Sequence, residues 1–192
     1  MRHLVLAAAL AAVMPAVAQE GGKEEPAARK QGEPVTSEGG LVLTGQEGWE
    51  KLEPKPMRAA SWKLPRAEKD ERDAELVVFW FKGGGGGVEA NIERWAGQFQ
   101  QPDGKSSKEA MKREKKEIAG LTVHLIDLSG TFVAETSPGS GKRVDQPDSR
   151  MLAAIVEGPN GPYFVKLVGP AATVEKWKES FQKFLEALRQ AG

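Results

Sequence analysis

The sequence predicts a mixed α/β domain in which hairpin-connected strands pack against two amphipathic helices. Three observations indicate this fold class. Residues 76–81 form an unbroken apolar run, LVVFWF, which is typical of a central strand covered on both faces. Asn160-Gly161 separates two apolar runs, a strong signal of a β-hairpin. Residues 174–188 repeat apolar side chains at the spacing of a helix that buries one face.

Residues 1–18 have the pattern of a signal peptide. Arg2 supplies positive charge, residues 4–13 form a short apolar core, and residues 16–18, Ala-Val-Ala, provide the small side chains of a cleavage site. A retained anchor is the alternative, but the apolar core is shorter than the roughly 20 residues that span a bilayer. We therefore expect a periplasmic or secreted protein with no membrane insertion after signal cleavage.

The composition excludes several classes of protein. The chain of 192 residues has no cysteine, which excludes disulfides, thiolate chemistry and a lipid anchor attached through cysteine. Removal of Arg2 with the signal leaves 26 of the 27 basic residues against 27 acidic residues. This balance argues against a nucleic-acid partner. The sequence also lacks the basic amphipathic helix that would indicate a role at a membrane surface.

The mature chain divides into a tether and one domain. Residues 19–40 are dominated by charged residues, glycine, proline and serine without apolar periodicity, which predicts a disordered linker. A partner-binding tail is the alternative. Residues 41–190 form the single predicted domain, and a chain of about 150 residues buries roughly two-thirds of its unfolded surface.

The first half of the domain predicts a hairpin followed by a helix. A short strand at 41–43 precedes strands at 57–64 and 74–81, which the polar turn 66–73 joins as a β-hairpin. Apolar residues then recur at the spacing of a helix that lies on the sheet, at Val88, Ile92, Trp95 and Phe99.

A charged edge strand and a bulged strand follow the polar loop 100–108. Residues 111–118 have helix propensity, but the turn at 119–120 favours an edge strand whose lysines block unwanted pairing. A short helix is the alternative. The next strand, 121–128, continues to residue 134 across a bulge at Ser129-Gly130.

The last part of the domain predicts a long loop, a hairpin and a helix. Residues 135–149 form the loop, and strands 151–156 and 163–168 form the hairpin around Asn-Gly. Thr173 is the predicted N-cap of the last helix. The apolar stripe of this helix is interpreted as core packing: Val174, Trp177, Phe181, Phe184, Leu185 and Leu188.

A run of five glycines, residues 83–87, joins the central strand to the first helix. Glycine lets backbone N–H groups approach a ligand, and a helix N-terminus attracts anions. The alternative is a mobile turn that requires positive φ. No Lys-Ser/Thr follows, so this is not a P-loop, and Val88 breaks the dinucleotide-binding fingerprint.

One flank of the first helix carries a donor-rich polar strip directly after the glycines. We predict a ligand site on this helix shoulder for a small anionic ligand or an envelope protein. Three glycines would contribute backbone donors and three polar residues would contribute side-chain contacts: Gly84, Gly85, Gly86, Asn91, Arg94 and Gln98.

Few residues suit catalysis or metal binding. Loss of the signal leaves His124 as the single histidine, and a histidine metal site needs two or more. Asp127 interrupts an apolar strand face, where a carboxylate must be paired or perturbed. A hydrolase that uses Asp127 or His124 is therefore the alternative function. The sequence assigns no catalytic residue, no metal and no cofactor.

Several motifs in order resemble the PsbP/Mog1-like domains of secreted bacterial proteins. They span residues 45–189 and comprise Pro56-Met57-Arg58-Ala59, Ala74-Glu75-Leu76, the glycine run, Asn91-Ile92-x-Arg94-Trp95-x-x-Gln98-Phe99, Lys166-Leu167-x-Gly169-Pro170 and the C-terminal Trp-Phe helix. The resemblance implies a central antiparallel sheet flanked by helices, an α/β/α sandwich. It also implies a non-catalytic binding or assembly module, and no family catalytic residue maps onto the chain.

Taken together, the sequence predicts a secreted or periplasmic, non-enzymatic binding or assembly module. A second alternative, beside the hydrolase, is a structural envelope component whose tether sets its reach. The sequence determines neither the ligand nor the oligomeric state.

Overall fold

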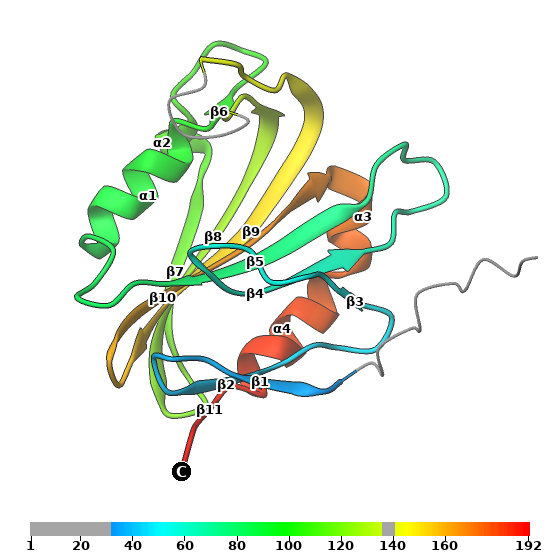
Figure 1. The fold of residues 1–192 in the computed structure, drawn as a ribbon. Helices are drawn as coiled ribbons and strands as arrows, with labels where there is room; N and C mark the ends of the chain where they lie inside the picture. Colours follow the sequence, from blue (N-terminus) through cyan, green and yellow to red (C-terminus); the bar gives the residue numbers. More distant parts are fainter. Residues whose placement is uncertain (1–31, 136–140) are drawn as a thin grey trace, which may run out of the picture.

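A computed structural model describes residues 32–135 and 141–192 (Figure 1). The expected signal peptide, residues 1–18, lies outside the described residues. The eight strands of the main sheet are β3 (Glu50–Lys51), β4 (Arg58–Leu64), β5 (Ala74–Trp80), β6 (Phe99–Gln100), β7 (Lys112–Ile118), β8 (Leu121–Phe132), β9 (Gln146–Gly158) and β10 (Gly161–Pro170). A small second sheet holds β1 (Pro34–Thr36), β2 (Leu41–Thr44) and β11 (Arg189–Gln190).

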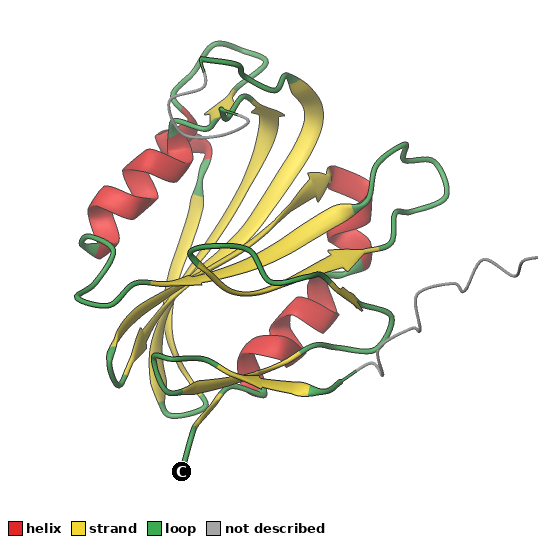
Figure 2. Cartoon of the chain, viewed as in Figure 1, coloured by secondary structure: helices red, strands yellow, loops and turns green. Residues whose placement is uncertain are grey.

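The main sheet is antiparallel, with the strand order β3-β4-β5-β10-β9-β8-β6, and β7 also pairs with β8. The helices are α1 (Val88–Ala96), α2 (Ser107–Ala110), α3 (Ala171–Lys176) and α4 (Lys178–Glu186). Helix α1 lies on one face of the sheet, and α3 and α4 lie on the other (Figures 1 and 2). The predicted fold class, a central antiparallel sheet flanked by helices, is confirmed.

Strand β5 is central because β4 and β10 flank it, as its apolar run predicts. Its side chains alternate between the two faces of the sheet and pack into two separate cores. Leu76 and Val78 join the core under α4, which also contains Trp49, Trp62 and Phe184 within 6.0 Å of one another by ring centroids. We call this cluster the α4-side core. The α1-side core comprises Ile92, Trp95, Ala96, Phe99, Met111, Ile126, Leu128, Met151, Ala153, Ile155 and Phe164.

Three predicted details of the sheet agree with the structure. The charged segment is the edge strand β7, whose residues from Lys112 to Glu117 are all exposed. The register of β8 shifts between Gly130 and Phe132, beside the predicted bulge. The β9–β10 hairpin forms, but its two-residue turn is Pro159-Asn160, and Gly161 at φ 109° already pairs with Gly158.

The ordered domain begins earlier than the sequence predicts. Residues 34–36 were expected within the disordered linker, but they form β1, which pairs with β2. Two contacts fix this segment. Ser37 Oγ lies 2.6 Å from the Tyr163 hydroxyl and donates to the Leu41 carbonyl at 2.8 Å. Composition cannot reveal such pairing, because it depends on partners distant in the chain. Residues 19–31 lie outside the described part.

The C-terminal helical segment differs from the prediction in its start and its continuity. Helix α3 begins at Ala171, so Thr173 lies inside the helix and is not its N-cap. Instead, the Asp70 carboxylate accepts a hydrogen bond from the Thr173 backbone N–H at 2.8 Å. Trp177 separates α3 from α4, yet the apolar stripe is buried in the α4-side core as predicted.

Two predicted element boundaries also shift. The first helix ends at Ala96, so Phe99, although buried as predicted, belongs to β6. Strand β9 begins at Gln146, inside the predicted loop 135–149. No helix among the described residues has the length and apolar character needed to cross a membrane.

Candidate functional site

The glycine run is a turn whose shape requires glycine at several positions. Gly83, Gly84 and Gly86 have φ values of 87°, 92° and 89°, in the left-handed region that other residues rarely adopt. At Gly85 a Cβ atom would lie 2.5 Å from the Phe164 ring and 2.7 Å from the Phe81 ring. The predicted alternative, a turn that needs positive φ, therefore accounts for much of the run.

Asn91 connects this turn to α1. The side chain is 1% exposed, and its Nδ2 donates to the carbonyls of Gly85 and Gly87, each at 3.0 Å. Its Oδ1 accepts from the Arg94 guanidinium. All three bonds are internal, so Asn91 holds the glycine turn and Arg94 in fixed positions.

Lys166 lies next to the predicted site residues, although the sequence pointed to it only as part of the motif Lys166-Leu167-x-Gly169-Pro170 and not as a ligand contact. It lies on central strand β10, opposite Ala153 of the α1-side core, so its side chain projects toward α1. The Nζ donates to Gln98 Oε1 at 2.6 Å and lies 5.8 Å from the Trp95 ring centroid. The sequence signal was available: Lys166 is the one charged residue in the apolar run YFVKLV.

The environment of Lys166 destabilises its charged form, although the ammonium is still the main form at pH 7. Burial, and then the nearby positive charge of Arg94, lower the pKa of Lys166 from its usual 10.5 to about 8. No described carboxylate forms an ion pair with Lys166 or with Arg94. Two cationic groups thus lie near each other without a negative counterpart.

The predicted site residues differ in whether their polar groups are free for a ligand. Gln98 bonds Lys166, the charge of the exposed Arg94 acts on Lys166, and both Gln98 and Arg94 have groups that can donate to a ligand. The Gly84 N–H is used by the Phe81 carbonyl at 2.9 Å, and the Gly85 carbonyl is used by Asn91. Oxyanions suit the resulting arrangement, because hydrogen bonds between cations and anions are stronger than neutral ones.

His124 and Asp127 do not form a common site. Asp127 pairs with Leu152, whose side chain belongs to the α4-side core, whereas His124 pairs with Ile155 of the α1-side core. The two side chains therefore lie on opposite faces of the sheet. Arg150 holds Asp127 through two bonds of 2.8 and 2.7 Å, and Glu157 Oε1 lies 2.8 Å from His124 Nε2.

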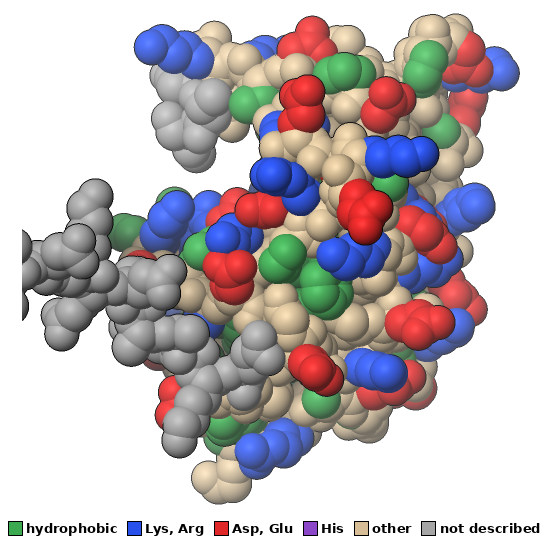
Figure 3. Space-filling view, turned by 90° about the vertical axis from the view of Figure 1, so that its right-hand side faces the viewer, with side chains coloured by type: hydrophobic (Ala, Val, Ile, Leu, Met, Phe, Trp, Pro, Cys, Tyr) green, Lys and Arg blue, Asp and Glu red, His purple; other side chains and the backbone are tan. Residues whose placement is uncertain are grey.

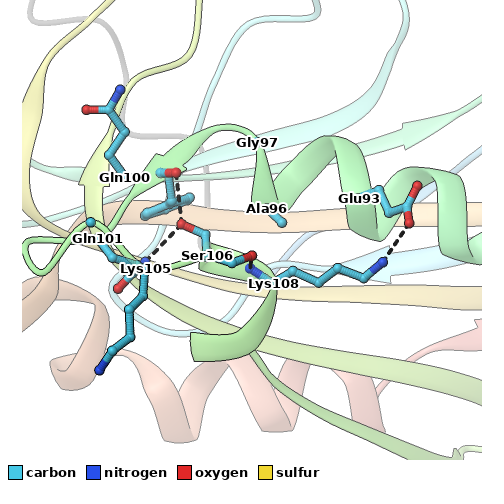
Figure 4. A pocket seen from close by; sticks show the side chains of 11 residues that line it. Glu93, Ala96, Gly97, Gln100, Gln101, Lys105, Ser106 and Lys108 are labelled. Atoms are coloured by element: carbon cyan, nitrogen blue, oxygen red, sulfur yellow. Dashed lines mark hydrogen bonds and ion pairs between the residues drawn. The ribbon is translucent and has the colours of Figure 1, made fainter.

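A polar pocket of about 630 Å³ lies beyond the C-terminal end of α1, beside β6 and α2 (Figure 4). None of the predicted site residues lines it. Lys108 crosses to Glu93 in an ion pair of 2.7 Å, and Gln101 donates to Ser107 Oγ at 3.0 Å. The polar side chains joined in this way satisfy one another.

Comparisons with known proteins concern the fold. The sequence matches no protein-family model and no curated protein sequence. Similar solved structures include a protein of unknown function from Pseudomonas aeruginosa, with 13% identity, coverage of 85% of this chain and 99% of that one, and a TM-score of 0.48. They also include cyanobacterial PsbP from Synechocystis sp. PCC 6803, with 12% identity, coverage of 86% and 99%, and a TM-score of 0.47.

A third similar structure is LpqN from Mycobacterium tuberculosis, which is involved in cell envelope biogenesis in that organism. The identity is 8%, the alignment covers 85% of this chain and 87% of LpqN, and the TM-score is 0.46. A PsbP is thus among the solved structures similar to this chain, as the motif order predicts. At these identities and TM-scores, no function passes from these proteins to this one.

Proposed function

We propose that the protein is a non-enzymatic binding module outside the cytoplasm, and that it holds an oxyanion between Arg94 and Lys166. The observation that carries this proposal is the pair of neighbouring cations that lack an ionic partner among the described residues. Each cation raises the energy of the other, and a bound anion relieves that repulsion.

The chemistry of the three polar side chains supports an oxyanion. Arg94 is exposed and presents a planar fork of donors that matches a carboxylate or phosphate. Gln98 gives its carbonyl oxygen to Lys166, which leaves the amide group of Gln98 as a further donor. The ligand could be a small anion or an acidic side chain of an envelope protein, because both present the same oxygens.

The position outside the cytoplasm is supported by the signal-peptide pattern of residues 1–18. A nucleic acid is not favoured as the anion. Positive and negative side chains are interspersed on the side that carries the β4–β5 turn and α3 (Figure 3), and the whole chain has equal numbers of basic and acidic residues.

A hydrolase is less well supported, because the two candidate catalytic residues lie on opposite faces of the sheet. Arg150 holds Asp127 in an ion pair, and His124 lies within hydrogen-bond distance of Glu157. The structural envelope component differs from the binding module in one expectation. Its role would depend on the tether, so loss of residues 19–31 would abolish function without changing ligand binding.

A thermal-shift screen of the mature chain with phosphate, sulfate, acetate and citrate tests the proposal. An anion at a hundredfold its dissociation constant adds about 2.7 kcal/mol to the unfolding free energy, a rise in Tm on the order of 5–10 °C. Arg94→Ala and Lys166→Met should each reduce the rise strongly. Arg113→Ala, at an arginine paired with Glu89 on α1, is the control and should keep it. Equal shifts in all variants would refute the proposed site.

A further inference from the structure

A second hollow lies on the opposite face of the sheet, between β7 and α4, with a volume of about 1030 Å³. Its floor is apolar and is made by Leu125, Leu152, Phe181 and Leu185. Leu125 remains only half-buried, although its side chain packs against the α4-side core. The outer strands of the sheet thus extend past α4 and leave a groove beside it. Leu125 is its partly exposed floor residue, because the other three are at most 5% exposed, and Glu114, Glu117 and Glu186 also line the groove.

The two ends of this groove can be identified from the strand register. Lys112 of β7 pairs with Asp127 of β8, and Asp127 is held by Arg150, which also bonds Glu175 shortly before α4 begins. Lys112 and Lys178, the first residue of α4, therefore border the same end. The other end is bordered by Ile118 and Leu185, where β7 and α4 finish.

The first end carries an excess of positive charge. Arg150 takes up the carboxylates of Asp127 and Glu175, and these bonds raise the pKa of Arg150 above its usual range. In the described part of the chain, neither Lys112 nor Lys178 forms an ion pair. Arg150 and its two carboxylates together carry one negative charge, so Lys112 and Lys178 leave this end of the groove with a net positive charge of one.

We propose that the groove binds a free long-chain carboxylate, with the acyl chain on the four floor residues and the carboxylate between Lys112 and Lys178. The groove is at the upper limit of the volume usual for small-molecule sites, which suits one extended chain. The unpaired lysines lie at a single end and set the direction of the chain, because Lys116, which also lines the groove, is paired with Glu114. This ligand and site are independent of the oxyanion bound at α1.

Calorimetric titration of the mature chain with octanoate, decanoate and dodecanoate, each below its micellar concentration, tests the proposal. Affinity should rise by up to about fourfold for each added methylene, because each buries more apolar surface. Dodecanol, which lacks the charge, should bind about tenfold more weakly than dodecanoate. Affinity that does not depend on chain length would overturn the proposal.

Substitutions of residues that line the groove test whether dodecanoate binds there. Lys112→Gln and Lys178→Gln should each weaken dodecanoate binding by about fivefold to tenfold, and Leu125→Asn should weaken it at least as much. Lys183→Gln, an exposed lysine of α4 that does not line the groove, is the matched control. Thermal unfolding checks that each variant folds.

Arg94→Ala separates the two sites. It should leave the rise of affinity with acyl chain length unchanged even if it abolishes the binding of small oxyanions, and of a carboxylate head group, at α1. If Arg94→Ala abolished dodecanoate binding while Lys178→Gln did not, the carboxylate would lie at α1 and the groove proposal would be wrong. Binding of two-chain lipid vesicles without binding of dodecanoate would also overturn it.

Discussion

At the scale of single residues, Lys166 gives the proposed α1 site its expected pH dependence. Its pKa of about 8 means that the ammonium loses its proton as the pH rises through 8. Anion affinity should therefore be full near pH 7 and fall between pH 7 and 9, which calorimetric titrations over this range would show. In Lys166→Met the remaining affinity should be flat over the same range. A wild-type affinity that does not change up to pH 9.5 would contradict the role of Lys166.

The same group makes a prediction about stability, and its sign is opposite to that of a lysine whose pKa is raised by an ion pair. The folded pKa of Lys166 lies below the unfolded value of 10.5, so the unfolded state binds more protons between pH 8 and 10.5. The unfolding free energy should consequently rise across this window relative to Lys166→Met. Urea denaturation at several pH values measures the difference, and a relative fall would show that the pKa of Lys166 is not lowered.

The glycine turn offers a residue-scale test with its own control. Gly85→Ala should destabilise the fold by roughly 1–3 kcal/mol, because the added Cβ would contact the rings of Phe164 and Phe81 at 2.5 and 2.7 Å. Gly87→Ala should change the unfolding free energy by less than about 1 kcal/mol, since φ is −70° and nothing lies within 4 Å of its Cβ, while alanine is a poorer N-cap of α1 than glycine. Equal effects of the two substitutions would show that Gly85 is not closely packed.

At the scale of elements, the start of α3 depends on a residue from a distant turn. Asp70, in the turn between β4 and β5, accepts the Thr173 N–H at 2.8 Å. Asp70→Ala should cost roughly 0.5–2 kcal/mol of unfolding free energy, the usual loss for an N-terminal cap. Glu68→Ala, an exposed residue of the same turn, is the control. Chemical denaturation of both variants measures the loss, and an unchanged Asp70→Ala would exclude the capping role.

Elements that are coded locally were predictable, and elements that depend on distant partners were not. The run 76–81 and the stripe of α4 carry their own apolar periodicity, so both were found. The strand β1 exists through its pairing with β2, and the start of α3 through Asp70, about one hundred residues earlier. No local pattern encodes either contact.

At the scale of the whole molecule, the sheet brings together side chains that are far apart in the chain. Arg94 and Gln98 were predicted from the spacing of one helix. Lys166 joins them because strand order and register place β10 under α1, which a single sequence does not specify. His124 and Asp127, in contrast, are near in the chain and do not come together. They lie three residues apart on β8, so the alternation of side chains along a strand places them on opposite faces.

The central claim of this account is that Arg94, Gln98 and Lys166 form one oxyanion site. A ¹H–¹⁵N NMR titration of the mature chain with sulfate and with acetate tests it most directly. The account predicts saturable shifts centred on the Gln98 side-chain amide and the Arg94 Nε–H, with the edge strand β7 unaffected. Shifts that do not saturate, or that spread evenly over the surface lysines, would contradict the claim.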